Sequence, residues 1–157
     1  AQARSVADAF KECGRAIGYV FQIIDDVLGV WGDEETTGKP VGADIRRKKN
    51  SFPVVYAMET ADGLDSKMLN KIYEKDELDD TDVESVLEVM DRLNVKNHAH
   101  NEAEKYAEAA MASLGFFSFS LARPTISHAV SALILLGLVS ANNSQFSFAL
   151  AQLPCRK

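Results

Sequence analysis

Residues 21–53 read FQIIDDVLGVWGDEETTGKPVGADIRRKKNSFP. The first part of this stretch has the spacing of an apolar helix, but it carries two adjacent aspartates, Asp25 and Asp26. Neighbouring carboxylates repel each other in apolar surroundings unless a cation or strong hydrogen-bond donors offset their charge. The pair therefore predicts a partner, and we expect a divalent metal ion with a phosphate attached to it.

The helical arrangement of this segment supports a ligand site, because residues three or four apart share one face of a helix. Five residues lie on one line in this way: Gly14, Gly18, Gln22, Asp25 and Gly29. Its small residues leave room for a ligand beside the polar centre. Successive residues are turned by about 100°, so Asp25 and Asp26 cannot point into the same cavity. We expect Asp25 to contact the metal and Asp26 to support it or to pair with a lysine.

Magnesium is the ion that fits this pattern best. It keeps several waters and is typically held by one or two carboxylates together with substrate phosphates. The histidines do not compete for the role, because His98 and His100 are two residues apart, do not share a helical face and are too few for a zinc site. We expect both histidines to be exposed surface residues.

Basic residues follow the aspartates in two places. Lys39 lies in Thr-Thr-Gly-Lys-Pro, where glycine and proline predict a turn from which the lysine can reach back over the helix end. Residues 46–49 are four consecutive basic residues, which alone would be interpreted as a solvated patch. The aspartates upstream make an anion-binding role the better interpretation. Residues 50–53, Asn-Ser-Phe-Pro, predict an N-cap followed by a proline in the first helical turn.

Taken together, residues 21–53 resemble the second aspartate-rich region of the trans-isoprenyl diphosphate synthases, the polyprenyl synthetase family. The elements Phe-Gln, Asp-Asp, Thr-Gly-Lys, Gly-x-Asp and Lys-x-Ser-x-Pro occur in register, and the similarity extends back through residues 14–18. The resemblance implies an all-α fold, part of the isoprenoid synthase helical bundle, with magnesium diphosphates bound in a central cavity. It also implies a prenyltransferase that joins an allylic diphosphate to isopentenyl diphosphate.

The resemblance also implies roles for individual residues. Asp25 would be the main magnesium ligand, with Asp26 as its companion in the metal site and Gln22 in support. Lys39 and Lys49 would hold the allylic diphosphate while its carbon–oxygen bond ionises. These two aspartates and two lysines are the candidate catalytic residues, and the lysines together with Gln22 are candidate substrate-binding residues.

The apolar residues beside the aspartates have two possible roles. Ile17, Phe21, Ile24 and Leu28 are expected to face a core. The last three are also candidates for the wall of a dry prenyl cavity, with Phe21 the candidate substrate-binding residue, although core packing is the expectation for any one of them.

One position departs from the family pattern. The fuller pattern has a third aspartate four residues after the first, and this chain has Gly29 there. We interpret the glycine as a variation that leaves the main ligand in place. In a complete synthase we expect Asp25→Ala to cost far more activity than Gly29→Asp, which restores the carboxylate of the wider family.

The resemblance covers only part of a synthase. No first aspartate-rich region precedes Gly14, and the chain begins inside a helical pattern. We therefore interpret residues 1–112 as the C-terminal half of a synthase-like domain, truncated on its N-terminal side and inactive alone, from a protein that is a homodimer at full length. The alternatives are a catalytically silent prenyltransferase-like subunit, a terpene cyclase or related ionising enzyme, and a plain helical interaction module.

Composition adds weaker limits. The net charge of −6 argues against nucleic acid as a partner. The two cysteines, Cys13 and Cys155, indicate a reducing compartment and no disulfide framework. The sequence has no convincing secretory signal and no run of about 18 apolar residues, so we expect a cytoplasmic protein without a membrane span.

The rest of the chain is predicted to be helical. We expect a helix from Pro53 to near Gly63, another over 67–75, one that follows a capping box at 81–84 and ends at Asn94, and one over 99–114.

The composition changes near the end of the last of these helices, where Tyr106 is the expected packing residue. Between Ala109 and Cys155 the only charged residue is Arg123. We interpret residues 113–157 as an atypical apolar tail, either helical, with a helix over 126–139, or poorly ordered.

Overall fold

The structure is a computed structural model that describes residues 2–114, with only the backbone described at 2–5 and 36. The helix expected over 126–139 and nearly all of the expected tail lie outside the described residues. Within the described range every regular element is a helix, which confirms the all-α prediction. The helices are α1 (Gln2–Trp31), α2 (Glu34–Thr37), α3 (Ala43–Arg46), α4 (Phe52–Thr60), α5 (Gly63–Tyr73), α6 (Asp80–Arg92) and α7 (Val95–Ser113).

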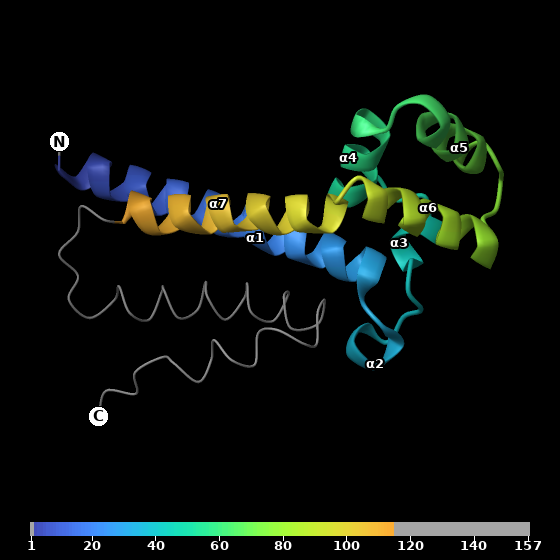
Figure 1. The fold of residues 1–157 in the computed structure, drawn as a ribbon. Coiled ribbons are helices and arrows are strands. Elements are labelled where there is room, and N and C mark those ends of the chain that lie inside the picture. The colour runs from blue at the N-terminus through green and yellow to red at the C-terminus, as the bar shows by residue number, and fades with distance from the viewer. Residues whose placement is uncertain (1, 115–157) are drawn as a thin grey trace, which may run out of the picture.

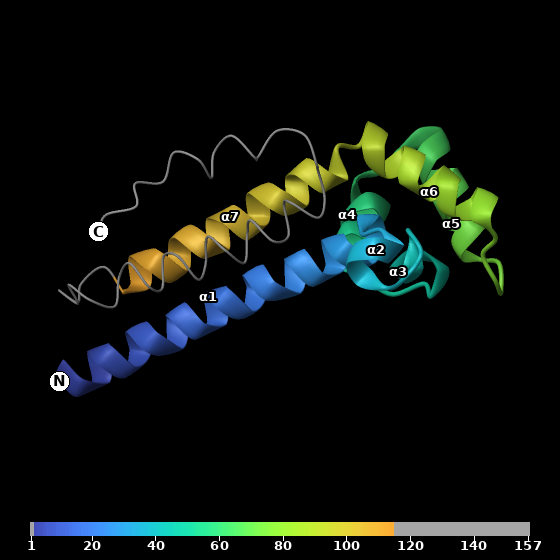
Figure 2. The same cartoon turned by 90° about the horizontal axis from the view of Figure 1, so that it is seen from below.

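Two long antiparallel helices, α1 and α7, form the body of the described chain. They lie side by side, and the shorter helices gather at the C-terminal end of α1 (Figures 1 and 2). The apolar face of α1 packs against a ladder of small side chains on α7, formed by Ala99, Ala103 and Ala107. Because these alanines are four residues apart and have no bulk, they share one helical face and allow the two helices to approach closely.

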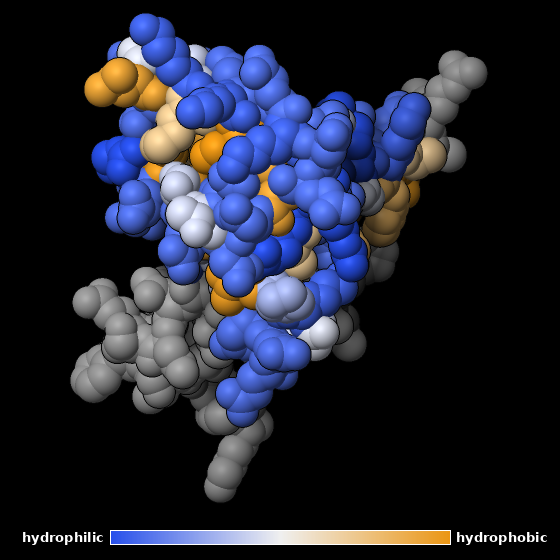
Figure 3. Space-filling view, turned by 90° about the vertical axis from the view of Figure 1, so that its right-hand side faces the viewer, coloured by the Kyte–Doolittle hydropathy of each residue, from blue (hydrophilic) through white to orange (hydrophobic). Residues whose placement is uncertain are grey.

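A second apolar cluster holds the short helices onto the end of α1. Val30 of α1 and Ile45 of α3 are fully buried in it, together with Val54 of α4 and Val86 of α6. This packing fixes the segment between α1 and α4 against the end of α1. The backbone of that segment is therefore held in place by core packing. The outer surface of this end of the molecule is largely hydrophilic, with small apolar patches between the charged side chains (Figure 3).

Several helix boundaries differ from the sequence predictions. The helix predicted over 67–75 begins earlier, at Gly63, and the helix predicted from 99 begins at Val95. The end predicted near Asn94 is confirmed, since Arg92 is the last residue of α6. The expected packing role of Tyr106 is shared with the alanine ladder, and its ring contacts Tyr19 with the ring centroids 4.8 Å apart.

The capping box predicted at residues 81–84 is wrong by two residues. The Asp79 carboxylate accepts from the Asp82 backbone N–H at 2.9 Å, and the Asp82 carboxylate accepts from the Asp79 N–H at 3.3 Å. Aspartate is as good an N-cap residue as threonine, so the run Asp79-Asp80-Thr81 offered more than one possible start. The helix starts after Asp79, where the Asp82 side chain completes the capping box and also pairs with Lys75.

Three side chains are placed differently from the prediction. Phe21 was expected to face the core, but it is 59% exposed, because the alanine ladder of α7 covers a different side of α1. The two histidines were expected to be exposed and are instead partly buried. The ring of His98 stacks on Tyr56 at a centroid distance of 3.8 Å, and the Nε2 atom of His100 is buried without a hydrogen-bond partner.

None of the helices in the described range is both long and apolar enough to cross a membrane.

Candidate functional site

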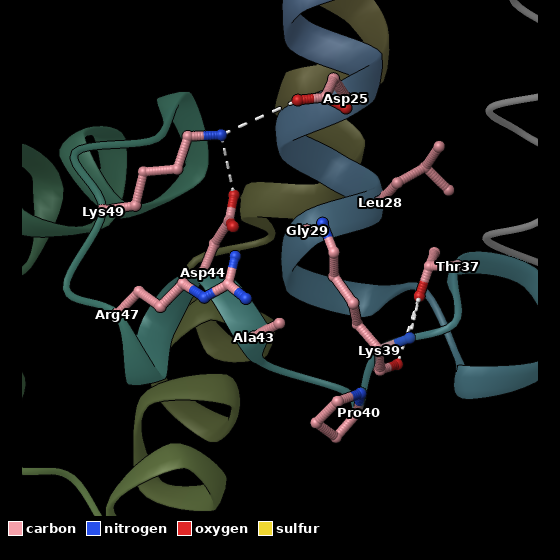
Figure 4. Close-up of a pocket in the computed structure, with 10 residues that line it drawn as sticks. All are labelled: Asp25, Leu28, Gly29, Thr37, Lys39, Pro40, Ala43, Asp44, Arg47 and Lys49. Atoms are coloured by element: carbon pink, nitrogen blue, oxygen red, sulfur yellow. Dashed lines mark hydrogen bonds and ion pairs between the residues drawn. The ribbon is translucent and has the colours of Figure 1, made fainter.

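The candidate site is a cavity at the C-terminal end of α1, where the chain between α1 and α4 returns toward the helix. Its volume is about 690 Å³ (Figure 4). Ten residues line it: Asp25, Leu28, Gly29, Thr37, Lys39, Pro40, Ala43, Asp44, Arg47 and Lys49. All of them fall inside the stretch 21–53 that the sequence analysis singled out. The cavity is therefore lined by one face of α1 and by the chain between α1 and α4.

A short turn after α2 places Lys39 at the cavity wall. Gly38 has a φ of 67°, a left-handed conformation that favours glycine. The Thr37 hydroxyl donates to the Asp33 carbonyl at 2.7 Å and accepts from the Lys39 backbone N–H at 3.2 Å. This turn confirms the prediction for Thr-Thr-Gly-Lys-Pro. Figure 4 shows the Lys39 side chain directed from the turn toward α1, as expected.

The next segment is anchored to the core by backbone contacts. Gly42 has a φ of 76°, and its N–H donates to the Val30 carbonyl at 3.0 Å. A Cβ atom at this glycine would lie 2.3 Å from the Val83 side chain, so a larger residue would push α6 away. This close packing brings α3, and with it Asp44, against the end of α1.

The ammonium group of Lys49 lies among three carboxylates. Its Nζ atom is 2.9 Å from Asp26, 3.0 Å from Asp44 and 3.8 Å from Asp25. The hydrogen bond to Asp26, followed by the bond to Asp44, raises the pKa of Lys49 well above its ordinary value. Lys49 is therefore a charged group that neutralises part of the acidic cluster within the protein itself.

Asp26 is almost completely buried and fully occupied by protein partners. Only 4% of the residue is exposed, and its carboxylate accepts from Lys49, from Gln22 Nε2 at 3.0 Å and from the Phe52 backbone N–H at 2.8 Å. Phe52 is the first residue of α4, so this carboxylate caps the helix from outside. The N-cap predicted within residues 50–53 is Ser51, and its buried hydroxyl has no hydrogen-bond partner. The lysine pairing expected for Asp26 is present.

Asp25 is the more exposed of the two carboxylates that line the cavity. Its side chain is 61% exposed, and its contact with Lys49 is the longest of the three. Asp25 and Asp26 thus point in different directions, as the helical geometry required. No group of three or more His, Cys, Asp or Glu side chains in the described part of the chain is arranged to hold a metal ion alone.

The predicted site residues fall into three groups. The cavity brings Asp25, Lys39 and Lys49 together. Gln22 and Asp26 are not among its lining residues. Gln22 donates to Asp26, and Asp26 also accepts from the Lys49 ammonium group and the Phe52 backbone N–H. Phe21 also does not line it.

The four basic residues at 46–49 do not form one anion-binding patch. Arg46 pairs with Asp80 at 2.6 Å, and Lys48 donates to the Tyr73 carbonyl at 3.2 Å. Only Arg47 and Lys49 line the cavity. Sequence reasoning therefore missed Arg47 as an individual, although the basic run contained it.

Asp44 also received no role from the sequence, although it is the aspartate of the Gly-x-Asp element. It is buried, lines the cavity and binds Lys49. The sequence signal that could have found it is a carboxylate between two apolar residues, Ala43 and Ile45. Both of these neighbours are buried in the structure.

Comparison with known proteins places the chain in a family. The model of the polyprenyl synthetase family matches residues 1–90. The chain belongs to the polyprenyl synthetase family. Two curated members are similar to it in sequence. The (2E,6E)-farnesyl diphosphate synthase of Mycobacterium tuberculosis is 49% identical over 55 residues, which are 35% of this chain and 15% of that protein. The short chain isoprenyl diphosphate synthase of Methanothermobacter thermautotrophicus is 36% identical over 118 residues, which are 75% of this chain and 36% of that protein.

Solved structures of the polyprenyl synthetase family share the helical fold. The geranylgeranyl pyrophosphate synthetase of Pyrococcus horikoshii superposes with a TM-score of 0.73 at 30% identity, covering 83% of this chain and 39% of that one. A polyprenyl synthetase of Streptomyces coelicolor shares the fold at 23% identity, with a TM-score of 0.70, covering 87% of this chain and 41% of that one. The matched segments span between 15% and 36% of the length of the two curated relatives.

Proposed function

We propose that the chain supplies a magnesium and diphosphate half-site of a prenyltransferase, which condenses an allylic diphosphate with isopentenyl diphosphate to make a longer isoprenyl diphosphate. The observation that carries this proposal is the composition of one cavity. It combines an exposed carboxylate, Asp25, with three cationic side chains, Lys39, Arg47 and Lys49. A carboxylate for a metal and several cations for phosphate oxygens are the groups that bind a metal diphosphate.

The available donors fit magnesium. Asp25 offers carboxylate oxygens to the cavity, whereas Oδ1 of Asp26 and Oδ2 of Asp44 already accept hydrogen bonds from Lys49. A site with one open carboxylate suits an ion that takes its other ligands from water and substrate phosphates. In the proposal Asp25 holds Mg²⁺, which when bound neutralises the negative charge that develops on the leaving diphosphate.

The chain's own residues have separate tasks in the proposed reaction. Lys39 and Arg47 donate charge-assisted hydrogen bonds to the diphosphate oxygens and hold the allylic substrate in place. As the allylic carbon–oxygen bond breaks, the electron pair leaves with the diphosphate. The two cations stabilise that charge without having to reorganise, because the turn at 37–39 and the core around α3 hold their backbones in place. Asp26 acts indirectly, because it fixes Lys49 and the start of α4.

In the proposed function, turnover requires groups beyond those in this cavity. A reaction between two diphosphates needs both substrates aligned, and alignment is a large share of catalysis in such reactions. The residues that line the cavity account for one metal diphosphate. We therefore expect diphosphate binding by the chain and no measurable condensation without the remainder of a synthase.

The proposal is tested by titrating inorganic pyrophosphate into the chain in a calorimeter, with Mg²⁺ and with EDTA. Binding should need Mg²⁺, and Lys39→Ala should weaken it by about tenfold or more, the value of one charge-assisted contact. Lys67→Ala is the matched control, because Lys67 is exposed on α5 and does not line the cavity. Equal binding by the two variants, or no binding by the unmodified chain, would contradict the proposal.

A further inference from the structure

The space beside Gly29 is filled by another residue's carboxylate. A Cβ atom added to Gly29 would lie 2.2 Å from Oδ2 and 2.4 Å from Cγ of Asp44. Two other glycines of α1, Gly14 and Gly18, have nothing within 4 Å of an added Cβ atom. All three lie within the same helix, so Gly14 and Gly18 are references for Gly29. An aspartate at position 29 would therefore have to displace the Asp44 carboxylate.

Asp44 has little freedom to move away from α1. It is buried between two buried residues of the short helix α3, and its carbonyl accepts from the Lys49 backbone N–H at 3.0 Å. Its carboxylate accepts from the Lys49 ammonium at 3.0 Å. Any group that displaces this carboxylate must break its contact with Lys49 or shift α3 in the core.

We infer that Gly29 and Asp44 form a positioning pair, in which the missing side chain of Gly29 admits the Asp44 carboxylate and this carboxylate holds the Lys49 ammonium away from Asp25. The third carboxylate of the site thus comes from α3, where the wider family pattern places one on α1. The relation of the pair to a metal diphosphate rests on the proposed function, whereas the contact between Gly29 and Asp44 is independent of it.

The distances explain why Asp44 matters to Asp25. Lys49 is shared by Asp26 and Asp44 at 2.9 and 3.0 Å and lies 3.8 Å from Asp25. If the charge of Asp44 is removed, the ammonium has only the two remaining carboxylates, and its attraction to Asp25 is no longer opposed from the α3 side. Lys49 would then neutralise the one carboxylate that is open to the cavity.

The first test compares melting temperatures of alanine variants on α1. Gly18→Ala should melt at or above the unmodified chain, because alanine favours a helix more than glycine does. Gly29→Ala should melt at least about 5 °C lower, because the added methyl group displaces the Asp44 carboxylate. In an Asp44→Ala background the second substitution should no longer lower the melting temperature. Equal behaviour of Gly29→Ala and Gly18→Ala, or an equal loss with and without Asp44, would overturn the inference.

The second test follows the Lys49 ammonium by NMR, with its resonance assigned by its loss in Lys49→Arg. The shape-conserving variant Asp44→Asn should shift or broaden this resonance and weaken pyrophosphate binding in Mg²⁺ by at least about threefold, whereas Gly18→Ala should leave the resonance unchanged. An unchanged resonance in Asp44→Asn would overturn the inference.

These two readouts also separate the positioning pair from the proposed function. The melting temperatures and the resonance need no ligand. If both behave as expected and pyrophosphate does not bind even the unmodified chain, the proposed function fails and the positioning pair stands. If Gly29→Ala does not fold while the double variant with Asp44→Ala does, the clash is demonstrated directly.

Discussion

Replacing Asp26 with alanine should destabilise the fold more than any other single change at the site. The substitution removes three hydrogen bonds, from Lys49, Gln22 and the Phe52 backbone N–H. A hydrogen bond to a charged group contributes about 1.5–3 kcal/mol, and a buried N–H left without a partner costs about 1–3 kcal/mol. Lys49 is partly exposed and keeps Asp44 as a partner, which places the ion-pair contribution at the low end of its range. We expect a net loss of about 2–4 kcal/mol.

Urea unfolding followed by far-ultraviolet circular dichroism measures this loss, provided that the slope of the transition is unchanged. Asp25→Ala is the matched control, since Asp25 is the next residue along the same helix, is mostly exposed and lies 3.8 Å from Lys49. An exposed ion pair of this kind contributes less than about 1 kcal/mol. If the two variants lose equal stability, Asp26 does not hold Lys49 and α4 together, and the reasoning fails.

Three further predictions concern stability and its pH dependence. Lys75 donates to both carboxylate oxygens of Asp82, at 2.6 and 2.8 Å, and so lowers the pKa of Asp82. The unfolded chain then binds more protons, so the urea midpoint should fall as the pH drops below about 4, and it should fall less steeply in Lys75→Met. Burial, assisted by the charge of Lys96, lowers the pKa of His100, so the midpoint should also fall as the pH drops below about 6.5. In His100→Gln the midpoint should no longer fall between about pH 6.5 and pH 4. If it still falls there, a group other than His100 causes the loss. Ser51→Ala should keep or raise the midpoint, because the buried hydroxyl makes no hydrogen bond, and a loss above about 1 kcal/mol would reveal a bond to that hydroxyl.

The parts of the fold that could be predicted from the sequence are those set by short-range signals. Apolar spacing predicted the helix that carries Asp25, and glycine and proline predicted the turn at Lys39. Residues 50–53 predicted an N-cap followed by a proline in the first turn, and α4 begins in this way after Ser51. Each of these signals acts within a few residues, so no knowledge of the tertiary arrangement was needed.

The parts that could not be predicted depend on contacts between distant segments. The apolar stripe of α1 is wider than the alanine ladder that covers it, so periodicity could not exclude Phe21 from the core. His98 contacts the rings of Phe52 and Tyr56 because α4 packs on the start of α7. The Asp44 carboxylate fills the space beside Gly29 because α3 returns to α1, and no local pattern reports such a return.

In the proposed function, Asp25 holds a metal diphosphate in the cavity at the end of α1. Titrating Mn²⁺ into the isotopically labelled chain with pyrophosphate tests it most directly, because the paramagnetic ion broadens the NMR signals of nearby residues. We expect broadening of amide signals around residues 25–29 and 37–49, none near Ser113 at the far end of α7, and loss of the effect in Asp25→Ala. Broadening that is absent, or that persists unchanged in Asp25→Ala, would contradict the account.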